Sequence, residues 1–363
     1  MTPTAQVLWG GFALAAVFGA IAQRTHFCTM GAVADIVNME DWTRMRMWLL
    51  AIGVAILGSA ALHASGLIDL DKSIYRGARL HWLAHLVGGY AFGYGMVLAS
   101  GCGAKTLVRV GGGNLKSLVV FLVTGLTAYM TMRGLFALPR VNYLEAVPLQ
   151  LGHGQDIPAF LAAWGLNPTW ALALPALLLG GGLVGFALWS PRAREFDNLL
   201  GGIGSGLCVV AAWYVSGHLG YLAEDPETLQ EAFVATNSGK MEALTFVAPQ
   251  AYSLELLMLW SDSSRKLSFA VVTAAGVILG SALQALASRR FRWEAFRDVE
   301  DTANHLLGAS LMGIGGVTAM GCTIGQGLSG LSTLALGSIL TFLAILAGAR
   351  HALVRQYRRL MGE

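Results

Sequence analysis

HLVGGYAFGYGMVLASGC (85–102) and HLLGASLMGIGGVTAMGC (305–322) are two versions of one stretch, and their relation decides the fold. Half of the aligned positions are identical, and each copy is an apolar, glycine-rich run that ends in Gly-Cys. A repeat at this separation divides a chain of 363 residues into two related halves. Each half is therefore expected to build the same arrangement of elements.

The composition predicts that these elements are helices in a membrane. Charged residues make up 12% of the chain, where a soluble domain carries about 25%, and the mean hydropathy is +0.59. The 46 glycines favour helices that approach one another closely within a bilayer. The net charge of +3 is small and spread between apolar runs, which excludes a nucleic-acid-binding surface. The predicted fold class is an all-α polytopic protein in contact with membrane lipid.

Charge-free windows of about twenty residues predict the helices that cross the bilayer. Spans are expected near 6–23, 47–67, 82–101, 117–132, 169–190, 198–217, 267–288, 303–320 and 331–349. The window 302–349 holds two of these spans joined by GCTIGQGLSG, so this joint is expected inside the membrane. Re-entrant or broken helices are therefore part of the predicted fold.

The two halves are expected to be inverted repeats. Four spans in each half, with span 169–190 between them, make the halves enter the membrane from opposite faces. The predicted division is a first repeat at 1–135, a linker with one span at 136–197, and a second repeat with a basic tail at 198–363. Inverted repeats with interrupted helices recur in transporters, which hold their substrates near the midplane where the halves meet.

Basic residues predict the orientation, because cytoplasmic loops carry an excess of Lys and Arg. An outside N-terminus and a cytoplasmic C-terminus, in the inner membrane of a bacterium, place five basic clusters inside: 44–46, 105–116, 192–194, 289–297 and 350–359. The acidic loop 220–231 is then outside, in agreement, but so are Lys72, Arg76 and Arg79. The first span lacks the basic start and the cleavage site of a signal peptide, so it is expected to be retained.

Cys102 and Cys322 are the strongest candidates for chemistry. Each follows a glycine, Gly101 or Gly321, at the end of equivalent spans, and the chain after each becomes glycine-rich from Gly103 and Gly325 onward. Non-helical backbone at membrane depth is tolerated only where it is buried in protein or lines a cavity. The two thiols are therefore expected to face a central cavity from opposite sides; the alternative is that they are small packing residues.

Cys28 and Cys208 are expected to differ in role. The apolar segment after Cys28, in FCTMGAVADIV, is too short to span and predicts a re-entrant helix whose N-terminal amides favour an anion. An interfacial helix with a buried thiol is the alternative. Cys208 lies in the middle of a span without a repeat partner and is expected to pack. Since the cysteines form no CxxC pattern, neither a metal site nor a cofactor is predicted.

Two lysines are candidates for attracting an anion. Lys105 follows Cys102 closely, and Lys240 lies in FVATNSGKMEALTF on the predicted outer side, flanked by apolar residues. Lys105 also satisfies the positive-inside rule, so its position has two explanations.

At these residues the chain resembles the YeeE/YedE family of sulfur-transport membrane proteins. The resemblance rests on FCTMGAVADI around Cys28 and on the paired stretches GYGMVLASGCGAKTLVRVGGGN and GIGGVTAMGCTIGQGLSGLS. It implies an hourglass-shaped protein that takes up thiosulfate, with Cys28, Cys102 and Cys322 along a central path. Family members that serve selenium metabolism make a selenium anion an alternative substrate.

The chemistry of thiosulfate agrees with neutral thiols as successive weak sites. Its oxygens accept N–H bonds and its terminal sulfur accepts weak S–H donors, and conduction requires sites that also release the ion. The predicted function is uptake without chemical conversion, with a cytoplasmic sulfur-carrier protein as an expected partner. The alternatives are a membrane sulfurtransferase or thiol oxidoreductase, and a soft-metal channel; both lack the expected sequence support, because no base adjoins the thiols and Met or His ligands do not cluster.

Overall fold

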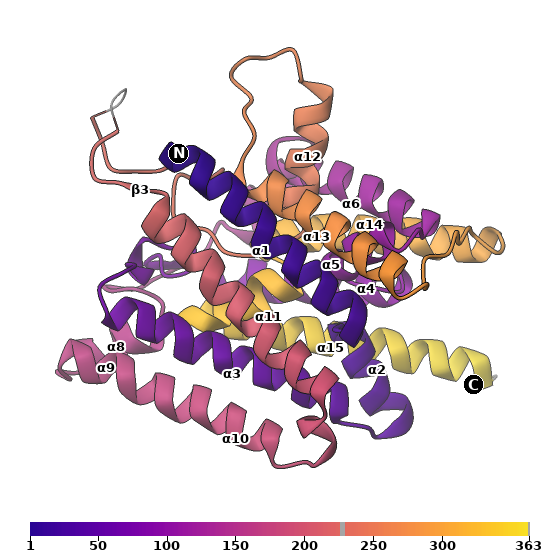
Figure 1. Ribbon diagram of the computed structural model, residues 1–363, viewed down its shortest axis with the longest axis horizontal. Coiled ribbons are helices and arrows are strands. Elements are labelled where there is room, and N and C mark those ends of the chain that lie inside the picture. Colours follow the sequence, from indigo (N-terminus) through magenta and orange to yellow (C-terminus); the bar gives the residue numbers. More distant parts are fainter. Residues whose placement is uncertain (226–228, 362–363) are drawn as a thin grey trace.

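The computed structural model describes residues 1–225 and 229–361, and these fold into a bundle of long helices around several short ones (Figure 1). The predicted all-α fold class is confirmed. The long helices are α1 (Pro3–Thr25), α3 (Thr43–Ala64), α4 (Trp82–Leu98), α6 (Leu115–Arg133), α11 (Phe196–Tyr214), α13 (Phe269–Ala287), α14 (Val299–Thr318) and α15 (Leu336–Met361). A further long segment is built from α9 (Pro168–Pro175), η3 (Ala176–Gly181) and α10 (Gly182–Leu188).

Eight segments of the described residues are long and apolar enough to cross a membrane, so the protein is a multi-pass membrane protein. They overlap eight of the nine predicted spans. The remaining span, 303–320, is helical as α14 but does not belong to these eight, because the first two turns of α14 carry Glu300, Asp301, Asn304 and His305. A ninth crossing therefore stays a prediction.

Short helices lie between the long ones, where broken or re-entrant helices are expected. They are α2 (Thr29–Met39), α5 (Gly103–Gly111), α12 (Ala248–Met258), and a helix that begins at Thr323 and continues as η6 (Gly325–Gly330) and η7 (Leu331–Thr333). The last span begins after this break, at Leu336 rather than at the predicted residue 331.

Helices α4 and α14, which carry the repeat, pack against each other reciprocally. A Cβ at Gly88 would lie 2.6 Å from the backbone N of Ala319, and a Cβ at Gly308 would lie 2.5 Å from that of Ala99. The beginning of each helix thus meets the end of the other, which makes the pair antiparallel. Glycine at both positions is required because backbone, which cannot move aside, occupies the space of a side chain.

The other long helices also pack across the two halves of the chain. Helix α1 packs on α13 while α11 packs on α3, and α4 packs on α15 while α14 packs on α6. In each pair of contacts, one helix comes from the first half of the chain and its partner from the second. The core consequently lies between the halves rather than within either one.

Small elements complete the loops. They are η1 (Leu70–Lys72), α7 (Ala137–Pro139), η2 (Arg140–Leu144), α8 (Ile157–Ala163), η4 (Arg192–Arg194), η5 (Val215–Leu219), β1 (Arg79–Leu80), β2 (Leu149–Gln150), β3 (Tyr221–Leu222) and β4 (Ala232–Phe233). Strands β1 and β2 pair antiparallel, as do β3 and β4. Strands β3 and β4 lie between η5 and α12 along the chain.

Candidate functional site

Three cysteines lie directly before short helices, and their backbone has one pattern. Cys28 precedes α2, Cys102 precedes α5, and Cys322 precedes the helix that begins at Thr323. Two residues before each cysteine, the chain adopts the left-handed conformation that commonly ends a helix, at His26 (φ 54°), Ser100 (φ 56°) and Met320 (φ 58°). Each thiol is therefore placed where one helix stops and the next begins. All three are buried.

The thiols of Cys28 and Cys102 are neighbours at this centre. The Cys28 Sγ also accepts from the backbone N–H of Gly31, at 3.5 Å, in the first turn of α2. Next to Cys28, the Thr29 hydroxyl is buried and has no hydrogen-bond partner among the described residues. This part of the site therefore offers two thiols and an unused hydroxyl at one helix start.

Cys322 adjoins the same centre from the other half of the chain. Its Sγ accepts from the backbone N–H of Gly325 at 3.4 Å and lies 3.9 Å from the Thr245 hydroxyl. The following residue, Thr323, lies beside Cys102, and its buried hydroxyl has no hydrogen-bond partner among the described residues. The two halves consequently meet through the residues at their two Gly-Cys breaks.

A cavity of about 250 Å³ lies beside Cys322. Its wall includes Gly321, the cysteine's neighbour, and Thr245, the hydroxyl that approaches the thiol. Met320 and Tyr75 complete this part of the wall. An ion that enters the cavity therefore reaches the backbone directly before Cys322.

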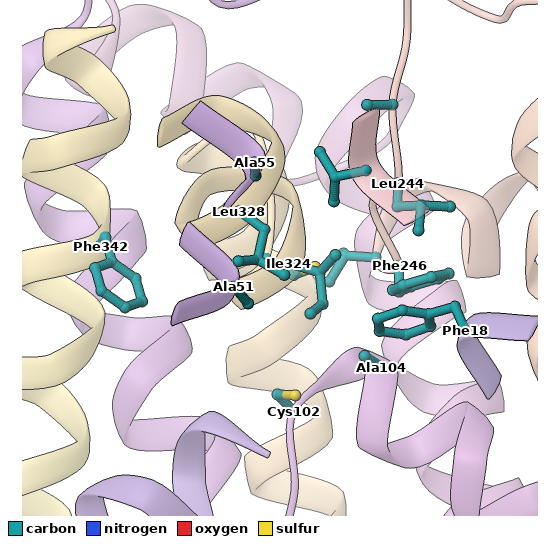
Figure 2. Packing of buried hydrophobic residues seen from close by; sticks show 14 of the residues in the cluster. Phe18, Ala51, Ala55, Cys102, Ala104, Leu244, Phe246, Ile324, Leu328 and Phe342 are labelled. Carbon is teal, nitrogen blue, oxygen red and sulfur yellow. The ribbon is translucent and has the colours of Figure 1, made fainter. Parts of the chain in front are cut away.

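Helix α12 is a fourth short helix at the centre, and the sequence alone did not identify it. Like α2 it has eleven residues, and it follows Phe246-Val247 as α2 follows Phe27-Cys28. Phe18 lies between the two phenylalanines, 6.4 Å from the Phe27 ring and 5.6 Å from the Phe246 ring. Figure 2 shows Phe18 and Phe246 stacked beside Ala104 of α5, with Cys102 nearby. In the sequence, the one indication that α2 and α12 correspond is the phenylalanine before each helix, Phe27 or Phe246.

The starts of α12 and α5 also touch. The carbonyl of Gly103 accepts from the Gln250 side chain at 3.3 Å, and a Cβ at Gly103 would lie 3.0 Å from the Phe246 carbonyl oxygen. Gly103 thus allows close approach of the two helix starts. Four helix N-termini converge, and their amides give this centre a positive potential.

Positive side chains surround the Cys28 side of the centre. The cations that act most strongly on Cys28 are Lys105 and Arg109 of α5. Arg44 lies against the first turn of α2, where a Cβ at Gly31 would collide with its guanidinium, and it pairs with Asp35 at 3.1 Å. These cations lie closer to the thiols than the charge-free windows suggested, because α5 folds back toward the centre.

The other predicted site residues have distinct places. Gly101 packs beneath Lys105, whose Cγ would be 3.2 Å from a Cβ there. Lys240 is exposed, whereas its neighbours Ser238 and Glu242 line the cavity. Cys208 is buried within α11, away from the three helix starts. Among the described residues, no group of three or more His, Cys, Asp or Glu side chains is arranged to hold a metal ion.

The arrangement suits transient binding of a small anion. Helix N-termini supply N–H donors, and neutral thiols and hydroxyls supply further weak donors at successive positions. A buried cation in the centre would bind the ion too strongly for release, whereas weak sites in series permit conduction.

Comparison with known proteins agrees with this geometry. Residues 24–350 match the family model described as sulphur transport. The chain is 28% identical to the thiosulfate transporter TsuA of Escherichia coli K12 over 327 residues, which cover 89% of this chain and 87% of that protein. It is 26% identical to the thiosulfate transporter TsuA of Spirochaeta thermophila over 358 residues, covering 94% and 97%. These names indicate a transporter and not an enzyme, and the family match, which covers most of the sequence, establishes that the chain belongs to the sulphur transport family of membrane proteins.

Proposed function

We propose that the protein carries thiosulfate, or a closely related sulfur oxyanion, into the cytoplasm without converting it. The observation that carries this proposal is that three buried thiols each stand at the N-terminus of a short helix, with a cavity beside one of them. The names of the two relatives support thiosulfate as the anion. Selenium oxyanions are the competing substrates, since their charge and shape are similar.

The proposed path runs from the cavity to Cys322, then to Cys102 and Cys28. Thr323 lies between the first two thiols, and Cys28 adjoins Cys102. Gly321, Gly101 and Gly103 keep the backbone close to the ion by leaving the space of a side chain free. Lys240 near the cavity and Lys105 beyond the thiols attract the anion at the two ends of the path.

The proposed orientation places the cavity outside, with the N-terminus outside and the C-terminus in the cytoplasm of a bacterium. The reciprocal packing of α4 and α14 supports an inverted repeat, with the divisions at residues 135 and 197. The basic inner face is the proposed docking site of a cytoplasmic sulfur-carrier protein. A reporter fused to the C-terminus should be active only in the cytoplasm; activity outside would contradict this orientation.

Uptake of labelled thiosulfate into proteoliposomes tests the function. The protein should accumulate label above empty vesicles, and unlabelled thiosulfate should compete better than sulfate or selenite. A variant with alanine at Cys28, Cys102 and Cys322 is the matched control, and it should insert and fold but lose uptake. Equal uptake by this variant would refute the thiol path, and a stronger effect of selenite than of thiosulfate would reassign the substrate.

A further inference from the structure

Among the described residues, one carboxylate, that of Glu242, lines the cavity beside Cys322. Glu242 lies in the wall together with Tyr75 and Tyr252, and burial raises the pKa of its carboxyl group. A carboxylate is an unexpected group here, because an ionised Glu242 would repel an anion in the same small cavity.

Glu242 has hydrogen-bond donors but no counter-ion. Its Oε1 accepts from the backbone N–H groups of Asn237 at 3.0 Å and Ser238 at 2.8 Å. Among the described residues, its carboxylate takes part in no ion pair. The two backbone donors hold the side chain in place without cancelling its charge.

The charged groups around this loop are engaged or face elsewhere. Lys72, whose carbonyl accepts from Met241, pairs with Glu231 at 2.7 Å. Arg133, beyond Tyr252, lies 3.6 Å from Glu255. Lys240 on the same loop is exposed to solvent. None of these cations therefore pairs with the Glu242 carboxylate inside the cavity.

Two tyrosines continue the wall on either side of Glu242. Burial raises the pKa of Tyr75 and of Tyr252, so both stay neutral O–H groups. The Tyr75 hydroxyl approaches the helix that follows Cys322, since a Cβ at Gly325 would lie 3.6 Å from it. Tyr75 thus connects the neighbourhood of Glu242 with that of the thiol.

We propose that Glu242 takes up a proton from the outer solution when a sulfur oxyanion enters this cavity, so that anion and proton bind together. The protonated carboxyl group is neutral and can donate its O–H to the anion, as Tyr75 and Tyr252 can. The proton returns to the outer solution when the anion has moved on to Cys322. This inference rests on the proposed transport of a sulfur oxyanion and adds a proton to its first step.

The sign of the pH effect follows from linkage. Above the pKa of Glu242 the anion must bring one proton, so its apparent affinity falls by about tenfold for each pH unit. Below that pKa the proton is already bound and the affinity becomes independent of pH. Thiosulfate itself does not titrate in this range, since it is the dianion of a strong acid.

The test is the KM of thiosulfate uptake into proteoliposomes as a function of the outer pH. The unmodified protein should show a KM that rises with pH, whereas Glu242→Gln should have a KM independent of pH. Glutamine keeps the oxygen that accepts from Asn237 and Ser238, so the loop is retained. Glu224→Gln is the control, because it removes an exposed carboxylate that takes part in no ion pair among the described residues, and it should leave the profile unchanged.

A second measurement separates this inference from the proposed function. When thiosulfate is added to the purified protein in weak buffer, the protein should take up about one proton per chain. The Glu242→Gln variant should take up none. If the unmodified protein transports thiosulfate but Glu242→Gln keeps its pH profile and its proton uptake, the inference is wrong. If no variant transports thiosulfate at any pH, the proposed function fails instead. Should glutamine prevent folding, Glu242→Asp must shift the pH profile; an unchanged profile overturns the inference.

Discussion

Helices α2 and α12 occupy corresponding places in the two halves, but only one begins with a thiol. Both have eleven residues, both follow a phenylalanine that packs on Phe18, and α2 contacts α15 as α12 contacts α6. Cys28 stands before α2 and Val247 before α12. The comparison teaches that the fold places four helix starts at the centre, whereas a thiol is not needed at every one of them.

The fourth position has a physical reason to be apolar. Val247 packs on α14, where a Cβ at Gly316 would lie 2.9 Å from its Cγ2. The hydroxyl of Thr245, two residues earlier, approaches Cys322 and supplies a polar group at this corner. A thiol at position 247 would therefore add little to a path that already passes Cys322.

The largest expected effect is the loss of a thiol from one of the three helix starts. Cys322→Ala, Cys102→Ala and Cys28→Ala should each lower uptake by about fivefold, because each removes one weak donor worth about 1 kcal/mol from a chain of matched sites. Serine at Cys322 should also impair uptake, because a hydroxyl is a poorer partner for a soft sulfur. Uptake of labelled thiosulfate, normalised to protein in the membrane, gives the measurement. Normal rates in all three alanine variants would leave the helix amides as the anion site.

An exchange of the two starting residues gives an intermediate test. Cys28→Val makes α2 begin like α12, and it should lower uptake about as much as Cys28→Ala and cost about 1 kcal/mol of stability, since valine is a poor residue before a helix. Val247→Cys should cost a similar amount by removing a methyl group from the contact with Gly316, yet retain uptake. Thermal unfolding in detergent measures the loss of stability of each variant, and uptake of labelled thiosulfate measures its loss of transport. A Val247→Cys variant without transport would show that the fourth start is as critical as the others.

The smallest effect is expected away from the helix starts. Cys208→Ala removes one buried heavy atom from α11 and should cost on the order of 1 kcal/mol of stability. Uptake should stay within about twofold of the unmodified protein, because Cys208 does not adjoin the centre. A strong loss of uptake with intact folding would add a fourth thiol to the path and break the distinction between the two kinds of cysteine.

Much of the fold could be predicted because the local amino-acid composition identifies membrane-spanning segments. A long apolar run has to be helical in lipid, where every backbone group must be satisfied internally. Gly-Cys at the ends of the two repeated spans likewise predicted breaks, and the left-handed Ser100 and Met320 occur there. The span predicted at 303–320 stays a prediction, because the first turns of α14 are polar: Asp301 pairs with Lys116 at 2.8 Å and with His305 at 3.0 Å.

The candidate site could be predicted only in part. Cys28, Cys102 and Cys322 were found from their positions beside glycines and short apolar segments. Glu242 and Thr245 were not, since nothing near them in the chain indicates that they line the cavity before Cys322. Their role depends on a loop that lies far along the chain from the repeated spans.

The sequence by itself determined which segments cross the membrane, where they break, and which residues stand at the breaks, because hydropathy and glycine act locally along the chain. The tertiary structure alone decided that the four helix starts meet, that Cys28 lies beside Cys102, and that Val247 takes the fourth place. These contacts join segments from opposite halves. They follow from close packing between glycine faces of α4 and α14, a property of two surfaces together that no single segment contains.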